Sequence, residues 1–326
     1  MGVVGFKPSY GLLSRWGVIQ YANSLDTVGI LARNVGDVRK LFWCLNWHDA
    51  QDPTSLPVSV RHRMKKTNGM QIKKKFRIGV PAEYNIEELS PIVRSAYIRT
   101  LTTLQSAGHT LYPISLPSTR QALSAYYVLA PAEASSNLAK YDGIRYGYRT
   151  SGPDASPKKN SPLFAQTRGE GLGDEVKRRI LLGAYTLSSE AIDNHFIQAQ
   201  KVRRLVQRDF DRVFAKSNPL LDARPFMSSH TERVDVILTP TAPTLPPTVE
   251  DVKQQGPVES YMNDVFTVPA SLAGLPAISL PVQLSEKEKH GMGEEDVKSV
   301  GMQILGQFGN DEVMLEAAGA VEELLR

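Results

Sequence analysis

Cysteine is almost absent from the sequence, with Cys44 as the only one in 326 residues. A single cysteine excludes a disulfide within the chain and a zinc site built from cysteines. The six histidines are isolated from one another and lack the spacing of metal ligands. We therefore expect no metal on this chain, and a reducing compartment is its natural setting.

Several sequence signatures of function are also missing. No stretch approaches the roughly 20 apolar residues that a membrane-spanning helix needs, and no signal or transit peptide is visible. The absence of a P-loop and of a Gly-x-Ser-x-Gly motif excludes ATP binding through a P-loop and the nucleophile elbow of α/β-hydrolases. A net charge of +4, from 38 basic and 34 acidic residues, is too small to indicate a protein that coats DNA.

The clearest structural signal is a βαβ pattern between residues 76 and 117. Residues 76–80 (Phe-Arg-Ile-Gly-Val) have the composition of a short buried strand. Ser90 and Pro91 then supply an N-cap and a first helical residue, and apolar residues follow at helical spacing as far as Gly108, a typical C-cap. Residues 110–116 return as a second strand, which predicts a right-handed crossover in a partly parallel sheet.

Further elements follow the same alternation. An amphipathic helix is expected from about Ile192 to Ala215. Strands are expected at 234–238, 277–282 and 300–305, and a last helix from Asn310 to Leu325. The alternation of strands and helices predicts an α/β fold.

Three segments, 58–75, 151–162 and 285–298, are expected to be surface loops or insertions, because they are polar and lack apolar periodicity. The first is strongly basic, with a run from Arg61 to Lys66. Such a run could contact RNA phosphates, but it has no interleaved aromatic residues to stack on bases. An exposed basic insertion is the preferred interpretation.

Several segments resemble the amidase-signature family. Residues 2–11 (Gly-Val-Val-Gly-Phe-Lys-Pro-Ser-Tyr-Gly) resemble the stretch that follows the nucleophile motif of that family, and we interpret them as a glycine-punctuated loop. Other segments resemble the branch that serves as the glutaminase component of tRNA-dependent amidotransferases; they are 133–138, 141–147, 175–183, 199–203, 261–264 and 269–276. The resemblance covers nearly the whole chain.

The resemblance implies an α/β/α sandwich around a mixed β-sheet, with residues 1–326 as the C-terminal two thirds of a single domain. Family members use a Ser–cis-Ser–Lys triad, in which the lysine activates the nucleophilic serine through the bridging serine. All three residues would lie upstream of residue 1, so no catalytic residue is assigned in this chain. A truncated gene model or a shortened isoform is the simplest account, and residues 1–326 alone are expected to be unstable.

The same resemblance implies a function in organellar translation. The chain would hydrolyse glutamine and pass the ammonia to a B-type partner subunit, which converts Glu-tRNA(Gln) to Gln-tRNA(Gln) with ATP and Mg²⁺. A small C-type or fungal F-type subunit would complete the complex. No cofactor is expected on this chain, and a mitochondrial matrix location follows from the family and from insertions at 217–233 and 285–298 that suggest a eukaryotic form.

Three residues that match the motifs of this branch are candidate glutamine ligands. Arg179 would hold the carboxylate in a two-pronged hydrogen bond, Asp264 would pair with the ammonium group, and Tyr126 would add a hydroxyl contact and one wall. Each has an ordinary structural alternative. Arg179 could be salt-bridged along its helix, Asp264 could cap a helix, and Tyr126 could be a core residue beside Tyr127.

Two rival functions remain open at this point. Another amidase-signature enzyme would act on a different small amide, and such enzymes line the pocket with apolar residues rather than an Arg/Asp clamp. A non-catalytic assembly subunit, formed by a truncated chain, is the second rival. The presence of both Arg179 and Asp264 favours glutamine hydrolysis over the first rival.

Overall fold

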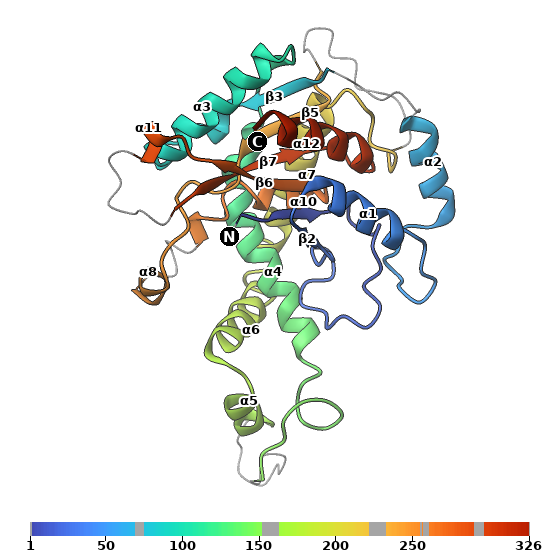
Figure 1. The fold of residues 1–326 in the computed structure, drawn as a ribbon. Helices are drawn as coiled ribbons and strands as arrows, with labels where there is room; N and C mark the ends of the chain where they lie inside the picture. Colours follow the sequence, from blue (N-terminus) through green and yellow to red (C-terminus); the bar gives the residue numbers. More distant parts are fainter. Residues whose placement is uncertain are drawn as a thin grey trace. The chain divides into compact units, whose positions relative to one another are not determined.

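Seven strands form one mixed sheet in the computed structural model (Figure 1). The structure describes residues 2–68, 75–151, 163–221, 233–254, 256, 261–289 and 297–325. The strand order is β2-β1-β6-β7-β5-β3-β4. The strands are β1 (Val4–Lys7), β2 (Ile30–Ala32), β3 (Arg77–Pro81), β4 (Thr110–Ile114), β5 (Val236–Pro240), β6 (Ala277–Gln283) and β7 (Ser299–Leu305).

The sheet combines parallel and antiparallel pairs. β3 runs parallel to both β4 and β5, whereas β7 runs antiparallel to β5 and β6. β1 is antiparallel to β2 and β6. The parallel β3–β4 pair is joined by α3 (Pro91–Ser106), which confirms the βαβ unit expected from the sequence. Gly108 adopts the left-handed conformation expected after that helix, with φ of +89°.

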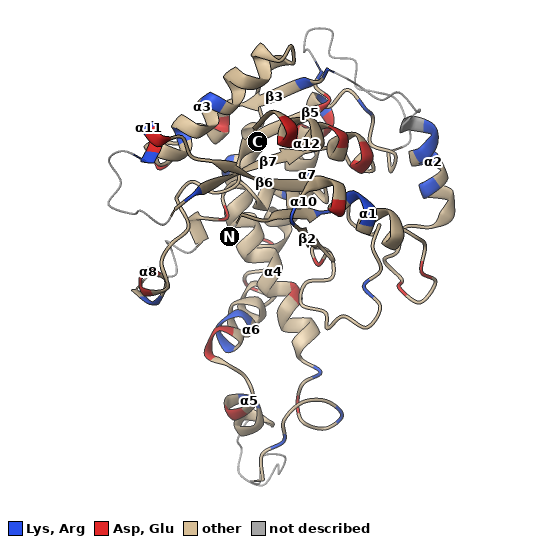
Figure 2. Cartoon of the chain, in the orientation of Figure 1, with Lys and Arg blue, Asp and Glu red and all other residues tan. Residues whose placement is uncertain are grey.

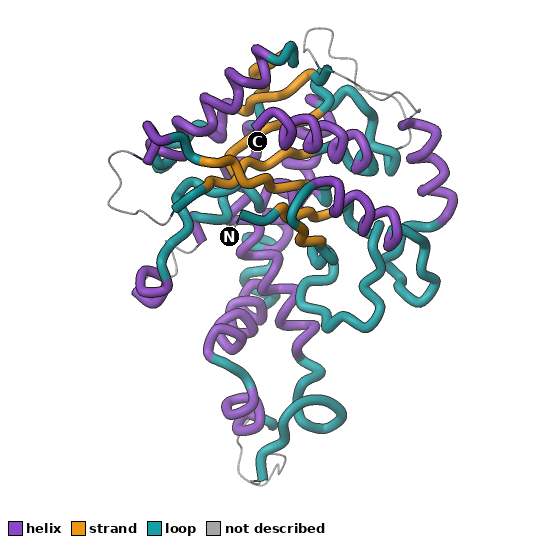
Figure 3. The backbone as a smooth tube through the Cα atoms, in the orientation of Figure 1, coloured by secondary structure: helices purple, strands orange, loops and turns teal. Residues whose placement is uncertain are grey.

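Helices cover the sheet on both faces (Figure 3). α12 (Asp311–Leu325) packs on β6 and β7 and also contacts α3 and α1 (Val35–Leu45), so these three helices share one face. Along β7, Gln303 points to the opposite face, where its amide donates to the carbonyl of Phe266, just before α10 (Val268–Ala273). Alternation along the strand thus separates an apolar face under α12 from a more polar face near α10.

The other elements expected from the sequence are also present. α7 spans Phe196–Val213, and β5, β6, β7 and α12 agree with their expected bounds to within about two residues. No described helix is long and apolar enough to cross a membrane.

Two segments differ from the interpretation made from sequence. Residues 4–7, interpreted as part of a glycine-punctuated loop, form strand β1, because they pair with both β2 and β6. The expected loop at 58–75 contains helix α2 (Val58–Asn68), whose single buried apolar residue, Met64, gives too little periodicity to be recognised. Residues 152–162 and 290–296 lie outside the described residues, and the short helix α11 (Glu286–Lys289) begins the third expected loop.

The chain divides into two compact units. The sheet unit comprises Met1–Gly17, Thr27–Leu123 and Arg203–Arg326. The helical unit comprises Val18–Asp26 and Ser124–Val202. The helical unit contains most of α4 (Ala122–Leu138), all of α5 (Ala165–Gly171) and α6 (Asp174–Thr186), and the first part of α7.

Candidate functional site

Arg179 lies on α6 in the helical unit, where two side chains hold its guanidinium group. Nε donates to Glu175 Oε1 at 2.8 Å, one helical turn earlier, and Nη1 donates to the hydroxyl of Tyr21 at 2.8 Å. The guanidinium carbon also lies 5.8 Å from the centre of the Tyr21 ring. Nη2 forms no hydrogen bond with the described residues, so one donor edge of the guanidinium remains for a ligand.

Tyr21 is itself fixed by the segment that carries it. Both Tyr21 and Ala22 donate their backbone N–H groups to the carboxylate of Asp26, at 2.9 and 3.1 Å. Asn137 on α4 donates to the Tyr21 carbonyl at 2.9 Å. The backbone of Tyr21 is therefore held from both sides, which positions its hydroxyl for Arg179.

The environment of Arg179 keeps it charged. Partial burial disfavours the cation, but the hydrogen bonds with Tyr21 and Glu175 outweigh this effect and raise the pKa of Arg179. The neighbouring Arg178 also binds Glu175, at 2.5 Å, but its side chain is 52% exposed, compared with 27% for Arg179. Arg179 therefore does form a salt bridge along its helix, with Glu175, as the structural alternative predicted. It also has a second contact, to Tyr21.

Tyr126 belongs to the same unit and lies on α4. Its ring packs edge to face against that of Tyr127, with the ring centres 5.1 Å apart. Tyr126 is half-buried rather than a core residue. Its position on a helix of the unit that holds Arg179 is compatible with the predicted wall, and its contact with glutamine stays a prediction.

Asp264 lies in the sheet unit, in the turn that leads into α10. Its carbonyl accepts hydrogen bonds from the backbone and hydroxyl of Thr267, at 3.1 and 3.2 Å, and from Val268 N at 3.0 Å. Asp264 itself is exposed. The N-cap of α10 is Thr267, so Asp264 contributes its backbone carbonyl to the turn before the helix rather than the cap itself. The contact of its carboxylate with the ammonium group of glutamine stays a prediction.

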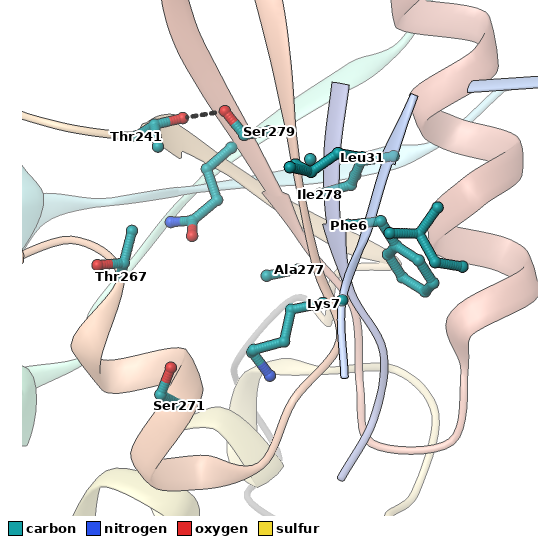
Figure 4. Close-up of a pocket in the computed structure, with 13 residues that line it drawn as sticks. Phe6, Lys7, Leu31, Thr241, Thr267, Ser271, Ala277, Ile278 and Ser279 are labelled. Atoms are coloured by element: carbon teal, nitrogen blue, oxygen red, sulfur yellow. Dashed lines mark hydrogen bonds between the residues drawn. The ribbon is translucent and has the colours of Figure 1, made fainter. Parts of the chain in front are cut away.

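A cavity of about 390 Å³ opens on the α10 face of the sheet, beside this turn (Figure 4). Its polar groups come from β1, β6 and β7, from the residue after β5, and from α10 and its N-cap. The hydroxyls of Thr241 and Ser279 are hydrogen-bonded to each other at 2.7 Å. The polar side chains lining it are those of Lys7, Thr241, Thr267, Ser271, Ser279 and Gln303.

Lys7 places an amine at the edge of this cavity. Its Nζ donates to the carbonyl of Leu275, and Figure 4 shows the side chain reaching toward α10, on the side of Ser271. Desolvation lowers the pKa of Lys7 to about 8, and the nearby carboxylate of Asp311 opposes that shift. Around neutral pH the Lys7 amine is therefore a donor whose proton is held less tightly than that of an ordinary lysine.

Asp311, at the start of α12, is buried and bound to Ser9. Its two oxygens accept hydrogen bonds from the backbone N–H and the hydroxyl of Ser9, at 2.8 and 2.6 Å. Ser9 Oγ accepts in turn from Gly309 N at 2.9 Å. Burial raises the pKa of Asp311 to about 6, while the Ser9 hydrogen bonds and Lys7 hold it down. This network fixes the chain directly after β1 to the last helix of the sheet unit.

The sequence did not reveal every residue of these sites. Tyr21, Glu175 and Lys7 were not predicted to contribute. A lysine between apolar residues in a short strand is a signal that could have identified Lys7, but the contact between Tyr21 and Arg179 spans 158 positions and has no local signature. Among the described residues, no group of three or more His, Cys, Asp or Glu side chains is placed to bind a metal ion.

Comparison with known proteins identifies the family. The model of the amidase family matches residues 1–315. The chain is 52% identical over 346 residues to the A-type subunit of the mitochondrial glutamyl-tRNA(Gln) amidotransferase of Ajellomyces capsulatus, and 54% identical over 337 residues to that of Emericella nidulans. These matches cover 98% of this chain but only 66% and 65% of the two relatives, so the chain spans a little under two thirds of their length.

Solved structures agree with this assignment. The crystal structure of the glutamyl-tRNA(Gln) amidotransferase A-type subunit from Thermotoga maritima superimposes with a TM-score of 0.67 at 28% sequence identity. The match covers 99% of this chain and 58% of that structure. With the family model matching nearly the whole sequence and the fold shared with solved relatives, the chain belongs to the amidase family.

Proposed function

We propose that the chain forms the larger part of the glutamine-hydrolysing subunit of a mitochondrial glutamyl-tRNA(Gln) amidotransferase. The observation that carries this proposal is 52–54% identity, over 98% of the chain, to proteins of that name. The reaction would hydrolyse the side-chain amide of glutamine, which gives glutamate and ammonia. The ammonia would then be used to amidate Glu-tRNA(Gln).

The geometry of Arg179 supports glutamine as the substrate. Free glutamine carries a carboxylate and an ammonium group, so its site needs a cation and an anion. Arg179 stays charged, is held by Tyr21 and Glu175, and keeps its Nη2 edge for a carboxylate. The proposal assigns the ammonium group to Asp264, which is exposed, and a hydroxyl contact to Tyr126, which is half-buried.

The cavity in the sheet unit supports a reaction close to β1. The family resemblance puts the nucleophilic serine shortly before Gly2, and β1 begins at Val4 and lines the cavity. Lys7, at the end of that strand, and the hydroxyls of Thr267 and Ser271 would offer hydrogen bonds to a polar substrate there. The Ser–cis-Ser–Lys triad itself is assigned to no residue of this chain.

The remaining partners follow from the same proposal. The complex would contain the B-type subunit and a small C-type or F-type subunit, and it would work in the mitochondrial matrix. ATP and Mg²⁺ would be bound by the B-type subunit, which activates Glu-tRNA(Gln).

The decisive experiment measures glutaminase kinetics of an amidotransferase assembled with the full-length subunit, which includes the segment proposed to carry the triad, with and without Arg179→Ala. Loss of a charge-assisted hydrogen bond costs about 1.5–3 kcal/mol, so we expect KM for glutamine to rise by about 10- to 100-fold with a smaller change in kcat. Arg178→Ala is the matched control, because Arg178 shares the salt bridge to Glu175 but is mostly exposed. Asp264→Asn should raise KM in the same direction.

The outcome also separates the rival functions. An unchanged KM in Arg179→Ala would remove Arg179 from the glutamine site. An assembled complex that hydrolyses other small amides but not glutamine would point to a different amidase. A complex with no amidase activity at all, despite binding of the B-type partner, would identify an assembly subunit.

A further inference from the structure

Helix α2 has the highest net positive charge among the described helices. Its eleven residues (Val-Ser-Val-Arg-His-Arg-Met-Lys-Lys-Thr-Asn) include four Lys or Arg and one His, with no Asp or Glu. Figure 2 shows it as a helix marked with basic positions and no acidic ones. No residue of α2 is a proposed glutamine ligand or lines the cavity of the sheet unit. The positive charge of α2 therefore requires a separate explanation.

One face of α2 is fixed to the sheet unit. Met64 is buried and packs tightly on Gly309. A Cβ atom added to Gly309 would lie only 2.7 Å from Met64 Cε. Arg61 donates from Nε to Leu56 O at 2.8 Å, from Nη1 to Asn46 Oδ1 at 2.6 Å and from Nη2 to Leu12 O at 2.8 Å. Arg61 is therefore a structural anchor, and the rest of the helix is held in a defined orientation.

The remaining basic residues cover the other faces of the helix. Each residue turns the helix by about 100°, so Arg63 and Lys65 flank Met64 on either side, while His62 and Lys66 lie on the side opposite to it. All four are exposed. Within the part of the chain that the structure describes, neither Lys65 nor Lys66 forms an ion pair or hydrogen bond. Their charge is available to an outside partner.

We propose that this outward face of α2, formed by His62, Arg63, Lys65 and Lys66, docks the sugar–phosphate backbone of the tRNA. The choice of RNA rests on the proposed function, because a tRNA is then the polyanion that the complex must hold. Lys and Arg without interleaved aromatic side chains suit phosphate contacts rather than base stacking. The face would thus add affinity and orientation without sequence specificity.

The test compares RNA binding by the assembled amidotransferase with that of a triple variant, R63Q/K65Q/K66Q. Binding of a fluorescently labelled tRNA(Gln) transcript is followed by anisotropy across a KCl series. Each lost phosphate contact reduces the slope of log K against log salt by roughly 0.7–0.9, so three should reduce it by about 2–3. Affinity at moderate salt should fall on the order of tenfold or more.

The matched control is K253Q/K287Q/K289Q, which removes the same formal charge from exposed positions elsewhere in the sheet unit. We expect its salt slope to equal that of the wild type. Equal losses of RNA affinity in both variants would show an effect of net charge alone. An unchanged salt slope in the α2 variant would show that α2 does not contact RNA. Either result overturns the proposal.

Two further measurements keep the interpretation specific. Glutaminase activity without tRNA should be the same in the α2 variant and the wild type, because α2 lies outside the proposed glutamine site. If no glutamine is hydrolysed even by the wild type, the proposed function fails while RNA binding by α2 is still decided by the salt series. If the α2 variant loses binding only to vesicles of mixed neutral and anionic phospholipid, a membrane surface replaces RNA and the proposal is wrong.

Discussion

The interior of the sheet unit and the interior of the helical unit are built from different kinds of side chain. In the sheet unit the fully buried residues include many large ones, among them Phe42, Phe210, Phe266, Leu238 and Ile278. Among the described residues of the helical unit, the buried apolar side chains are seven alanines, Leu129 and Pro131. Because an alanine buries about one methyl group, the helical unit gains far less from apolar burial.

Polar contacts and close backbone packing take the place of a large core in the helical unit. Ser24 donates its N–H and its hydroxyl to Glu133 on α4, at 2.8 and 2.5 Å. α6 approaches α4 so closely that a Cβ on Gly183 would lie 2.0 Å from the carbonyl oxygen of Pro131. Large apolar side chains such as Leu181 stay exposed.

The difference has a consequence for the candidate glutamine ligands. Regions with few buried apolar contacts open at lower free energy than a packed core. Arg179 and Tyr126 lie in the helical unit, whereas Asp264 and the cavity belong to the sheet unit. Local opening around Arg179 should therefore cost less than opening of the sheet, which would suit the proposed uptake and release of glutamine at this side chain.

The largest effect is expected from Leu238→Ala in β5. Leu238 is 1% exposed and lies on a strand whose five residues are all buried. Truncation should destabilise the sheet unit by about 3–4 kcal/mol. Urea unfolding gives the free energy, and Leu31→Ala, at a position 77% exposed, is the control and should change it by less than about 0.5 kcal/mol. Equal losses in both would contradict a core centred on β5.

Gly183→Ala should destabilise the helical unit, with a smaller effect than that of Leu238→Ala on the sheet unit. The added methyl group would collide with backbone at Pro131 and with Ser135, and neither can move without separating α6 from α4. We expect a loss of about 2–3 kcal/mol, confined to the helical unit. Amide hydrogen exchange by mass spectrometry resolves the two units. Gly169→Ala in α5, with open space around it, should be neutral or slightly stabilising.

The sequence predicted the sheet unit far better than the helical unit. β3, α3, β4, α7 and α12 were recognisable because a large core imposes apolar periodicity on each element. The packing of α6 against α4 was not predictable, because close contact through Gly183 leaves no periodic pattern of apolar residues in the sequence. β1 and β2 were missed because strands of four and three residues are too short to show alternation.

The candidate site shows the same limit. The family resemblance directed attention to Arg179, Asp264 and Tyr126, and the structure places each on a definite element. The support for Arg179 came from Tyr21 and Asn137, which are distant in sequence and share no periodicity with it. Polar contacts between distant segments are fixed by the fold, so sequence pattern alone cannot predict them.

A pH experiment sharpens the comparison, because the sheet unit buries the carboxyl group of Asp311, which is 3% exposed. Burial raises the pKa of Asp311 from 3.8 to about 6. The folded state therefore binds this proton more tightly than the unfolded chain does, and stability falls as pH rises from about 4 to about 6. The stability advantage of the wild type over Asp311→Asn should be about 2 kcal/mol larger at about pH 4 than at about pH 7.

The readout is specific to the sheet unit, because Trp16, Trp43 and Trp47 all belong to it and are the only tryptophans in the chain. Urea unfolding followed by tryptophan fluorescence at the two pH values gives the difference. Asp251→Asn is the control, since hydrogen bonds from Thr248 lower the pKa of Asp251 and give the opposite sign. A wild-type advantage that does not change with pH would show that Asp311 is not protonated on folding.

The smallest effect is expected from Glu133→Gln, which keeps the shape of the side chain but removes its charge. The two hydrogen bonds from Ser24 would become neutral, and such bonds are about half as strong as charged ones. We expect the amides of residues 18–26 to exchange with an opening free energy lower by about 1 kcal/mol, while the sheet unit is unchanged. Because this segment carries Tyr21, KM for glutamine should rise by about two- to fivefold in the same variant.

Glu170→Gln is the control, because Glu170 is an exposed glutamate that accepts a hydrogen bond from Tyr148 within the same unit. Faster exchange of residues 18–26 with an unchanged KM would show that the segment is held by Glu133 but that its Tyr21 does not position Arg179.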